Sequence, residues 1–135
     1  MLKINTQKHI PLYLSAISAG FASSAEDYID KSIDLNEELV KHPAATFFVR
    51  VKGYSMIGCG IAEGDILIVD RSLDPQNNSI IIAYLDGEFT VKRVRKDNHG
   101  FYLIPENKNF KPIKVSDKSD FEVWGSVTYV IKKIR

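Results

Sequence analysis

Ser55 lies in the glycine-rich stretch VKGYSMIGCGIAEGD, residues 51–65, between a β-branched run and an apolar run. Glycine allows turns and close backbone approaches that other residues resist, so the stretch predicts a bent loop that could hold the hydroxyl at a crowded point. A serine hydroxyl attacks carbonyl carbons well only when a neighbouring base removes its proton. The loop therefore suggests a nucleophilic serine, and an ordinary turn is the simpler alternative.

The base that Ser55 would need is not an obvious histidine. The histidines of the chain are His9, His42 and His99. Each lies in a polar or linker setting, and no spacing ties one of them to Ser55 and a carboxylate, so a conventional triad is weakly supported. A lysine can act as the base if burial lowers its pKa from about 10.4 toward neutral pH. Lys92, flanked by Val91 and Val94, is the best-placed lysine, although on the strand alone an exposed lysine is the commoner case.

The chain from Thr46 onward has the pattern of a mainly β domain. Short runs rich in β-branched and aromatic residues alternate with Gly, Pro, Asn and Asp, which is typical of strands joined by turns. These runs are TFFVRVK, DILIVD, SIIIAYL, EFTVKRV, FYLIP and FEVWGSVTYVIKKI. We expect a compact fold of about six or seven strands.

The Asp-Gly pair at residues 86–87 joins two of these runs. It favours the tight hairpin turn whose twist matches paired strands, so the strand at 79–85 should pair with the strand that follows the turn. Because side chains alternate along a strand, Lys92 should share one face with Thr90 and Val94.

The N-terminal part of the chain has a different character. Residues 1–24 carry no sustained helical or strand period, and the run SAISAGFASS is typical of an extended, accessible segment. We expect a flexible arm over residues 1–24, followed by a single β-rich domain over residues 25–135.

Two capping boxes predict one or two short helices after the arm. The pairs are Ser23 with Glu26 and Asp34 with Glu37. The second helix should bury Leu35 and Leu39 and end at Pro43.

Composition bounds the class of protein. A length of 135 residues with 44% hydrophobic content suits one domain that needs no disulfide or metal to fold. The net charge of +1 gives no overall field for nucleic acid or anionic membranes. The single cysteine, Cys59, excludes an internal disulfide and a multi-cysteine metal site. No apolar run is long enough to span a bilayer, and polar residues interrupt the outline of a secretory signal, so we expect a cytoplasmic protein without a cofactor.

The serine loop and the hairpin lysine together match a known arrangement. The stretch GYSMIGCGIAEGDILIVDRS, followed by the lysine of DGEFTVKRV, resembles the Ser/Lys self-cleaving family of LexA repressors and UmuD mutagenesis proteins. The resemblance implies the LexA/UmuD-type protease fold, with Ser55 as the nucleophile and Lys92 as the general base. Backbone amides of Ser55 and Met56 would stabilise the oxyanion. The other matching residues are expected to be scaffold: Gly60, Ile61, Gly64, Asp65 and Asp70.

The resemblance also gives the small-residue arm a role. Members of this family cut their own chain between a small residue and a glycine, and Ala19-Gly20 is such a pair. A repressor of the family has a DNA-reading helical domain before the cut, and the 18 residues before Ala19 are too few for one. The similarity is therefore to UmuD-like proteins, with Tyr54 as a departure at a position where the family often has an acidic residue.

A UmuD-like protein is implied to be a homodimer whose cleavage is promoted by the RecA filament on single-stranded DNA. Its shortened form is implied to join a UmuC-like Y-family DNA polymerase subunit in the error-prone translesion synthesis of the SOS response. Two alternatives stay open: a non-cleaving module that docks a polymerase, and a processing peptidase that acts on other chains.

Other features have simpler explanations. The basic cluster VKRVRK, residues 91–96, could contact nucleic-acid phosphate, but a solvated hairpin end is the favoured interpretation. Cys59 could be a reactive thiol and is more often a small buried side chain. Three residues of the last strand are expected in the core or an interface: Trp124, Val127 and Tyr129.

Overall fold

The computed structural model describes residues 10–13 and 29–135. It divides into a unit that ends at Lys41 and a unit from His42 to Arg135, and each is described by itself. The expected boundary between arm and domain, at residues 24 and 25, lies outside the described residues. Ala19 and Gly20, the expected cleavage site, also lie outside them.

The first unit contains a two-stranded sheet and one helix. Strand β1 (Ile10–Tyr13) pairs antiparallel with strand β2 (Ile29–Ile33), and helix α1 (Leu35–Leu39) follows. Strand β1 falls within the segment expected to be an arm. The helix expected after Ser23 would begin outside the described residues, and residues 29–33 form a strand.

Helix α1 begins at the predicted cap but buries nothing. The Asp34 side chain accepts a hydrogen bond from the Asn36 amide at 2.9 Å, which confirms the predicted N-cap. Leu35 is 60% exposed, so the prediction that the helix buries it is wrong. A helix of five residues is little more than one turn and has no long apolar face. It ends at Leu39, before Pro43 is reached.

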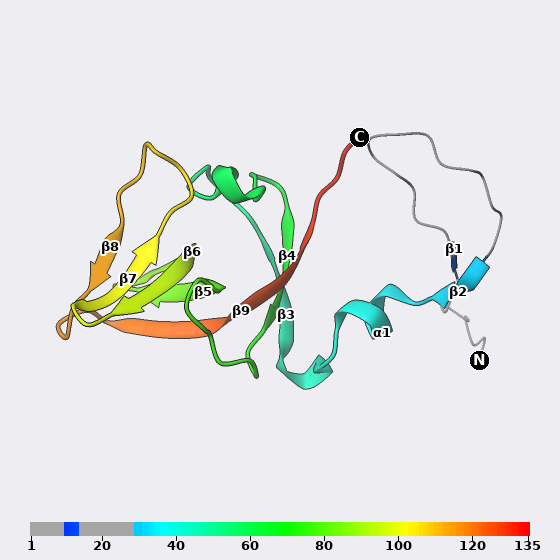
Figure 1. The fold of residues 1–135 in the computed structure, drawn as a ribbon, viewed down its shortest axis with the longest axis horizontal. Coiled ribbons are helices and arrows are strands. Elements are labelled where there is room, and N and C mark those ends of the chain that lie inside the picture. The colour runs from blue at the N-terminus through cyan, green and yellow to red at the C-terminus, as the bar shows by residue number, and fades with distance from the viewer. Residues whose placement is uncertain (1–9, 14–28) are drawn as a thin grey trace. The chain divides into compact units, whose positions relative to one another are not determined.

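The second unit is a seven-stranded antiparallel sheet with the strand order β3-β4-β9-β5-β6-β7-β8 (Figure 1). The prediction of a mainly β fold is confirmed. The strands are β3 (Thr46–Arg50), β4 (Ile66–Asp70), β5 (Ile80–Leu85), β6 (Glu88–Asp97), β7 (Gly100–Ile104), β8 (Ile113–Val115) and β9 (Phe121–Ile131). Two short 3-10 helices accompany them: η1 (Pro43–Ala45) and η2 (Ile57–Cys59).

The hairpin between β5 and β6 has the predicted turn. Asp86 and Gly87 both have positive φ, 48° and 92°, as the tight hairpin turn requires. Leu85 then pairs with Glu88, and the register runs back to Ile81 opposite Lys92. The turn thus determines the position of Lys92 on the sheet.

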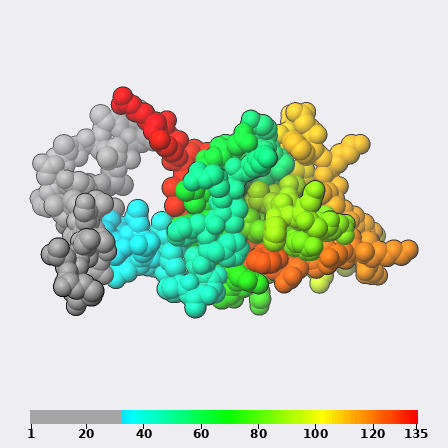
Figure 2. All heavy atoms as spheres, turned by 180° about the vertical axis from the view of Figure 1, so that it is seen from behind, coloured from blue at the N-terminus to red at the C-terminus, as the bar shows by residue number. Residues whose placement is uncertain are grey.

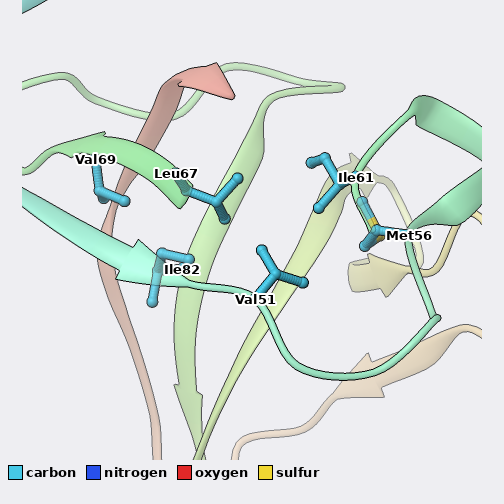
Figure 3. Packing of buried hydrophobic residues seen from close by; sticks show 6 residues of the cluster. All are labelled: Val51, Met56, Ile61, Leu67, Val69 and Ile82. Atoms are coloured by element: carbon cyan, nitrogen blue, oxygen red, sulfur yellow. The ribbon is translucent and has the colours of Figure 1, made fainter. Parts of the chain in front are cut away.

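Met56 ties the serine loop to the larger of two apolar clusters. It is 1% exposed, and in Figure 3 it lies beside Ile61, with Val51 nearby. The buried members of this cluster are Val51, Met56, Ile61, Leu67, Val69 and Ile82. A second cluster is formed by Ile81, Ala83, Val94 and Leu103. Because the residue after Ser55 is buried, the loop cannot move far without exposing apolar surface.

Candidate active site

The serine loop, residues 51–65, is closed at its base by hydrogen bonds between its two ends. The Val51 amide donates to Asp65 O at 2.8 Å, and the Gly64 amide donates to Val51 O at 2.9 Å. Within the loop, the Ile61 amide donates to Met56 O at 3.3 Å. Ser55 thus lies on a closed loop, and the residue after it, Met56, is buried.

Lys92 comes from the middle of β6 and reaches Ser55. Its Nζ lies 2.9 Å from Ser55 Oγ, 2.7 Å from Thr90 Oγ1 and 3.1 Å from Val91 O. The lysine is only 7% exposed. The structure therefore brings together the two side chains that the sequence singled out from loop and hairpin.

Burial favours the neutral form of this lysine. Desolvation lowers the pKa of Lys92 from its ordinary value of 10.5 because an ammonium loses hydration inside the protein. A neutral amine has two N–H donors and one lone pair. Thr90 Oγ1 and Val91 O can accept the two donors, which leaves the lone pair for the Ser55 hydroxyl proton.

The segment that follows β7 makes hydrogen bonds to the serine loop. The Glu106 amide donates to Ser55 O at 2.7 Å, and the Gly58 amide donates to Glu106 O at 2.6 Å. The Asn107 side chain donates from Nδ2 to Tyr54 O at 2.8 Å. Figure 2 shows the two segments side by side on the surface, the loop in green and the residues after β7 in yellow.

These contacts were not found from the sequence. Two of the three use backbone atoms on both sides, and a backbone hydrogen bond between distant segments leaves little trace in residue types. The one signal is Gly58: a Cβ there would lie 2.5 Å from Glu106 O, so no larger residue fits without a backbone shift. The pair Arg93 and Glu106, 2.6 Å apart between Nε and Oε1, further ties this segment to β6.

The comparisons with known proteins agree with this geometry. A family model described as Peptidase S24-like matches residues 11–128. The chain belongs to this family. It is 45% identical over 121 residues to Protein MucA of Salmonella typhimurium, covering 89% of this chain and 82% of the relative. It is 41% identical over 133 residues to Protein ImpA of the same organism, covering 93% and 85%. It is 39% identical over 129 residues to Protein SamA of S. typhimurium strain LT2, covering 96% and 89%.

The expected family resemblance is thereby confirmed. The S24-like chain is a UmuD-like member of the LexA/UmuD family. The family identifies it as a serine peptidase, and the relatives place it among the UmuD-like SOS mutagenesis proteins.

Two buried carboxylates of the S24-like domain lie in structural networks. Asp65 is 5% exposed and accepts from Lys132 Nζ at 2.5 Å and from the Ala62 amide at 2.9 Å. The hydrogen bond from Lys132 is the main cause that holds the pKa of Asp65 below its ordinary value, and the Ala62 amide adds to it. The Lys132 contact joins the end of the serine loop to the residue that follows β9, and the Ala62 contact lies within the loop.

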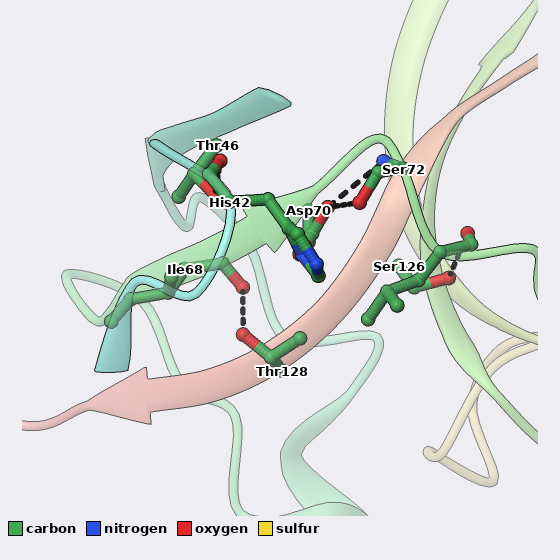
Figure 4. A network of polar contacts seen from close by, with 8 residues as sticks. His42, Thr46, Ile68, Asp70, Ser72, Ser126 and Thr128 are labelled. Carbon is green, nitrogen blue, oxygen red and sulfur yellow. Dashed lines mark hydrogen bonds and ion pairs between the residues drawn. The ribbon is translucent and has the colours of Figure 1, made fainter. Parts of the chain in front are cut away.

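Asp70 lies at the end of β4 between His42 and Ser72 (Figure 4). Its Oδ2 is 2.5 Å from His42 Nδ1, and its Oδ1 accepts from the Ser72 amide and hydroxyl at 2.8 and 2.6 Å. Burial by itself would raise the pKa of Asp70, but the hydrogen bonds from Ser72 and His42 outweigh it and lower the pKa. His42 is thus engaged by Asp70 and is no base for Ser55.

The remaining residues singled out from the sequence have other partners. Cys59 is half-buried and donates from Sγ to Met56 O at 3.2 Å. Tyr54 is exposed and donates to Glu63 at 3.0 Å, and this bond is the main cause that raises its pKa. Trp124 packs edge-on against Phe47 and Phe89.

Neither a metal site nor a membrane span is found in the described part of the chain. No three His, Cys, Asp or Glu side chains of these residues gather as metal ligands would. None of the helices described in residues 29–135 is long and apolar enough to cross a membrane.

Proposed function

We propose that the chain is a self-cleaving serine peptidase in which Ser55 attacks the carbonyl carbon of Ala19 and Lys92 is the general base. The observation that supports this most strongly is the distance of 2.9 Å between Lys92 Nζ and Ser55 Oγ, with the lysine buried. A nucleophile within hydrogen-bond reach of a base, and a base fixed by further partners, is the arrangement that activates a hydroxyl.

The reaction begins when the lone pair of Lys92 Nζ takes the Ser55 hydroxyl proton as Oγ bonds to the Ala19 carbon. The resulting tetrahedral intermediate carries a negative oxygen, which the backbone amides of Ser55 and Met56 stabilise by hydrogen bonds. Collapse of the intermediate breaks the bond to the Gly20 nitrogen, and the Lys92 ammonium returns its proton to that nitrogen. An ester then joins Ser55 to Ala19.

Water completes the reaction. Lys92, neutral again, takes a proton from the attacking water as its oxygen bonds to the ester carbon, and returns it to Ser55 Oγ as the ester breaks. The products are a peptide that ends at Ala19 and a chain that begins at Gly20. Because only neutral Lys92 is active, the rate rises with pH until the lysine is fully deprotonated.

The biological role that we propose follows from membership in the UmuD-like group. The protein is a cytoplasmic homodimer, the RecA filament on single-stranded DNA promotes its cleavage, and the shortened form joins a UmuC-like Y-family polymerase subunit in translesion synthesis. The support for this role is the similarity to MucA, ImpA and SamA over most of the chain.

The test is incubation of the purified chain from pH 7 to pH 10, with and without RecA filament, followed by mass analysis and N-terminal sequencing of the products. We expect a chain beginning at Gly20, faster at higher pH and with filament, and no product from Ser55→Ala or Lys92→Ala. Lys96→Ala, which removes an exposed lysine of the same strand, is the matched control and should cleave normally. Cleavage by Ser55→Ala at the same bond would refute the proposal.

A second arm of the test separates self-cleavage from processing of other chains. Wild-type protein is mixed either with an isotopically labelled Ser55→Ala chain or with unrelated peptides that contain Ala-Gly bonds. If the unrelated peptides are cut as fast as the labelled chain, the processing alternative is favoured instead.

A further inference from the structure

Two peptide units flank Ser55, and the segment after β7 holds the carbonyl oxygen of each. Tyr54 O accepts from Asn107 Nδ2 at 2.8 Å, and Ser55 O accepts from the Glu106 amide at 2.7 Å. A trans peptide is rigid and planar, and its N–H points away from its C=O. Holding these two oxygens therefore determines the directions of the Ser55 and Met56 amide N–H groups.

Those two amides are the ones that the proposed reaction needs. Within residues 10–13 and 29–135, neither the Ser55 amide nor the Met56 amide donates a hydrogen bond. Met56 is buried and Ser55 is half-buried, and with no protein acceptor among the described residues both amides are available to an incoming oxygen.

Asn107 is itself held in one orientation. Its Oδ1 accepts from the Asn109 amide at 2.9 Å, so its NH2 group must be the side that meets Tyr54 O. The Phe110 amide donates to Asn107 O at 3.1 Å and closes the turn around the residue. The other donor to Tyr54 O, the Ile57 amide, lies farther away at 3.4 Å. The closer bond to Tyr54 O is therefore the one from the Asn107 side chain.

We propose that Asn107 is a positioning residue for the cleavage reaction: by holding Tyr54 O, it keeps the Ser55 amide directed at the oxyanion. The inference rests on the proposed function, because the oxyanion arises only if Ser55 attacks a carbonyl. Asn107 touches neither the serine oxygen nor the lysine, so it acts on the amide and not on the proton transfer.

This role can be tested without rebuilding the core. Asn107 lines an open surface depression of about 670 Å³ together with Gly58, Glu106 and Lys108, so changes at this side chain leave the buried clusters intact. Asn107→Asp keeps the acceptor for the Asn109 amide but cannot donate to Tyr54 O, and Asn107→Ala removes both contacts. Asn109→Ala is the matched control, because its backbone amide remains.

The kinetic readout is the pH profile of self-cleavage. Loss of one oxyanion donor costs 10²–10³ in rate in serine peptidases, and loss of its positioning should cost about 10–100-fold. We expect this fall in the maximal alkaline rate of both Asn107 variants, an unchanged midpoint pH in the uncharged Asn107→Ala because Lys92 keeps its partners, and a normal profile for Asn109→Ala. A variant that merely loosens the fold would move the midpoint, since Lys92 would regain water.

A second readout does not depend on cleavage. In ¹H–¹⁵N spectra, the Ser55 and Met56 amide signals should shift or broaden in Asn107→Asp, while signals of β4 and β9 stay in place. The inference is overturned if Asn107→Asp cleaves at the wild-type maximal rate, if only its midpoint moves, or if both amide signals are unchanged. If the wild-type protein does not cleave at all, the proposed function fails, and the amide signals alone decide whether Asn107 orients the loop.

Discussion

Thr90 Oγ1 lies 2.7 Å from Lys92 Nζ, two residues along the same strand and on the same face of β6. The threonine can accept one N–H of the neutral amine, and Val91 O, at 3.1 Å, can accept the other. Strand β6 thus supplies the base and the two groups that orient its lone pair. Thr90 lies on the same face because alternate residues share a face, and Val91 contributes its backbone oxygen.

Replacement of this threonine by valine should change both the rate and the pH profile. Thr90→Val keeps the shape but removes an acceptor that also stabilises the ammonium form, so the pKa of Lys92 should fall further. We expect the midpoint of the cleavage profile to move to lower pH, with a maximal rate reduced about tenfold because the lone pair is less well directed. A pH–rate series on wild type and Thr90→Val measures both effects, and a midpoint that moves upward would contradict the assignment.

Burial of Lys92 should also make stability depend on pH. The pKa of Lys92 is lowered in the folded protein, whereas in the unfolded chain it has its ordinary value of 10.5. Between these two values the unfolded chain binds more protons, so the free energy of unfolding should rise with pH in this window. Below the lowered pKa the full cost of burying the charge is present.

Lys92→Met tests this linkage because it fills the same space without a charge. The variant should be more stable than wild type at pH 7 and should lose the rise of stability toward pH 10.5. Urea unfolding at several pH values measures this difference. Parallel stability curves for the two proteins would show that Lys92 is not buried as described.

Gly58→Ala should separate the serine loop from residue 106. A Cβ at this position would lie 2.5 Å from Glu106 O, so the backbone must shift, at a cost of about 1–3 kcal/mol. We expect lower stability and slower cleavage. Gly58 has no positive φ, so the effect of an added Cβ comes from its crowding against Glu106 O. If Gly58→Ala cleaved at the wild-type rate, the contact between Gly58 and Glu106 would have no part in the site.

The pair of Asp65 and Lys132 should stabilise the base of the serine loop at neutral pH. Lys132→Ala removes a hydrogen bond to a buried carboxylate, and since Lys132 is 40% exposed we expect a loss of about 1–2 kcal/mol. The pKa of Asp65 is lowered in the fold, so the stabilisation is present above its ordinary value of 3.8 and is lost as pH falls through the lowered value. Unfolding measured from pH 5 down to pH 2 should show a weaker acid dependence in Lys132→Ala, and an unchanged dependence would exclude this pair as its cause.

The sequence was a good guide to local structure in the sheet. The Asp-Gly turn predicted the β5–β6 hairpin, and alternation along β6 placed Lys92 and Thr90 on one face. These features depend on neighbours in the chain, so residue types record them. Strand β8 was missed because three residues with lysine at the centre carry too short a pattern.

The long-range parts of the site were harder to predict. The residue types alone made Lys92 the best-placed lysine base for Ser55, and the resemblance to a known family gave the two residues their roles as base and nucleophile. The contacts of Glu106 and Asn107 with the loop join residues about fifty positions apart, those of Glu106 use only backbone atoms, and no periodicity encodes them. Leu35 was misassigned because its capping box predicts a helix but not what packs against it.

The central claim is that neutral Lys92 activates Ser55, and the most direct measurement compares the titration of Lys92 with the pH dependence of cleavage. The Lys92 side chain, labelled with ¹³C, is titrated by NMR in Ser55→Ala protein, and the cleavage rate of wild type is followed over the same pH range. The account predicts a lysine pKa below 10.5 that matches the midpoint of the rate profile. A lysine that titrates at or above 10.5, or a rate that does not follow its titration, would contradict it.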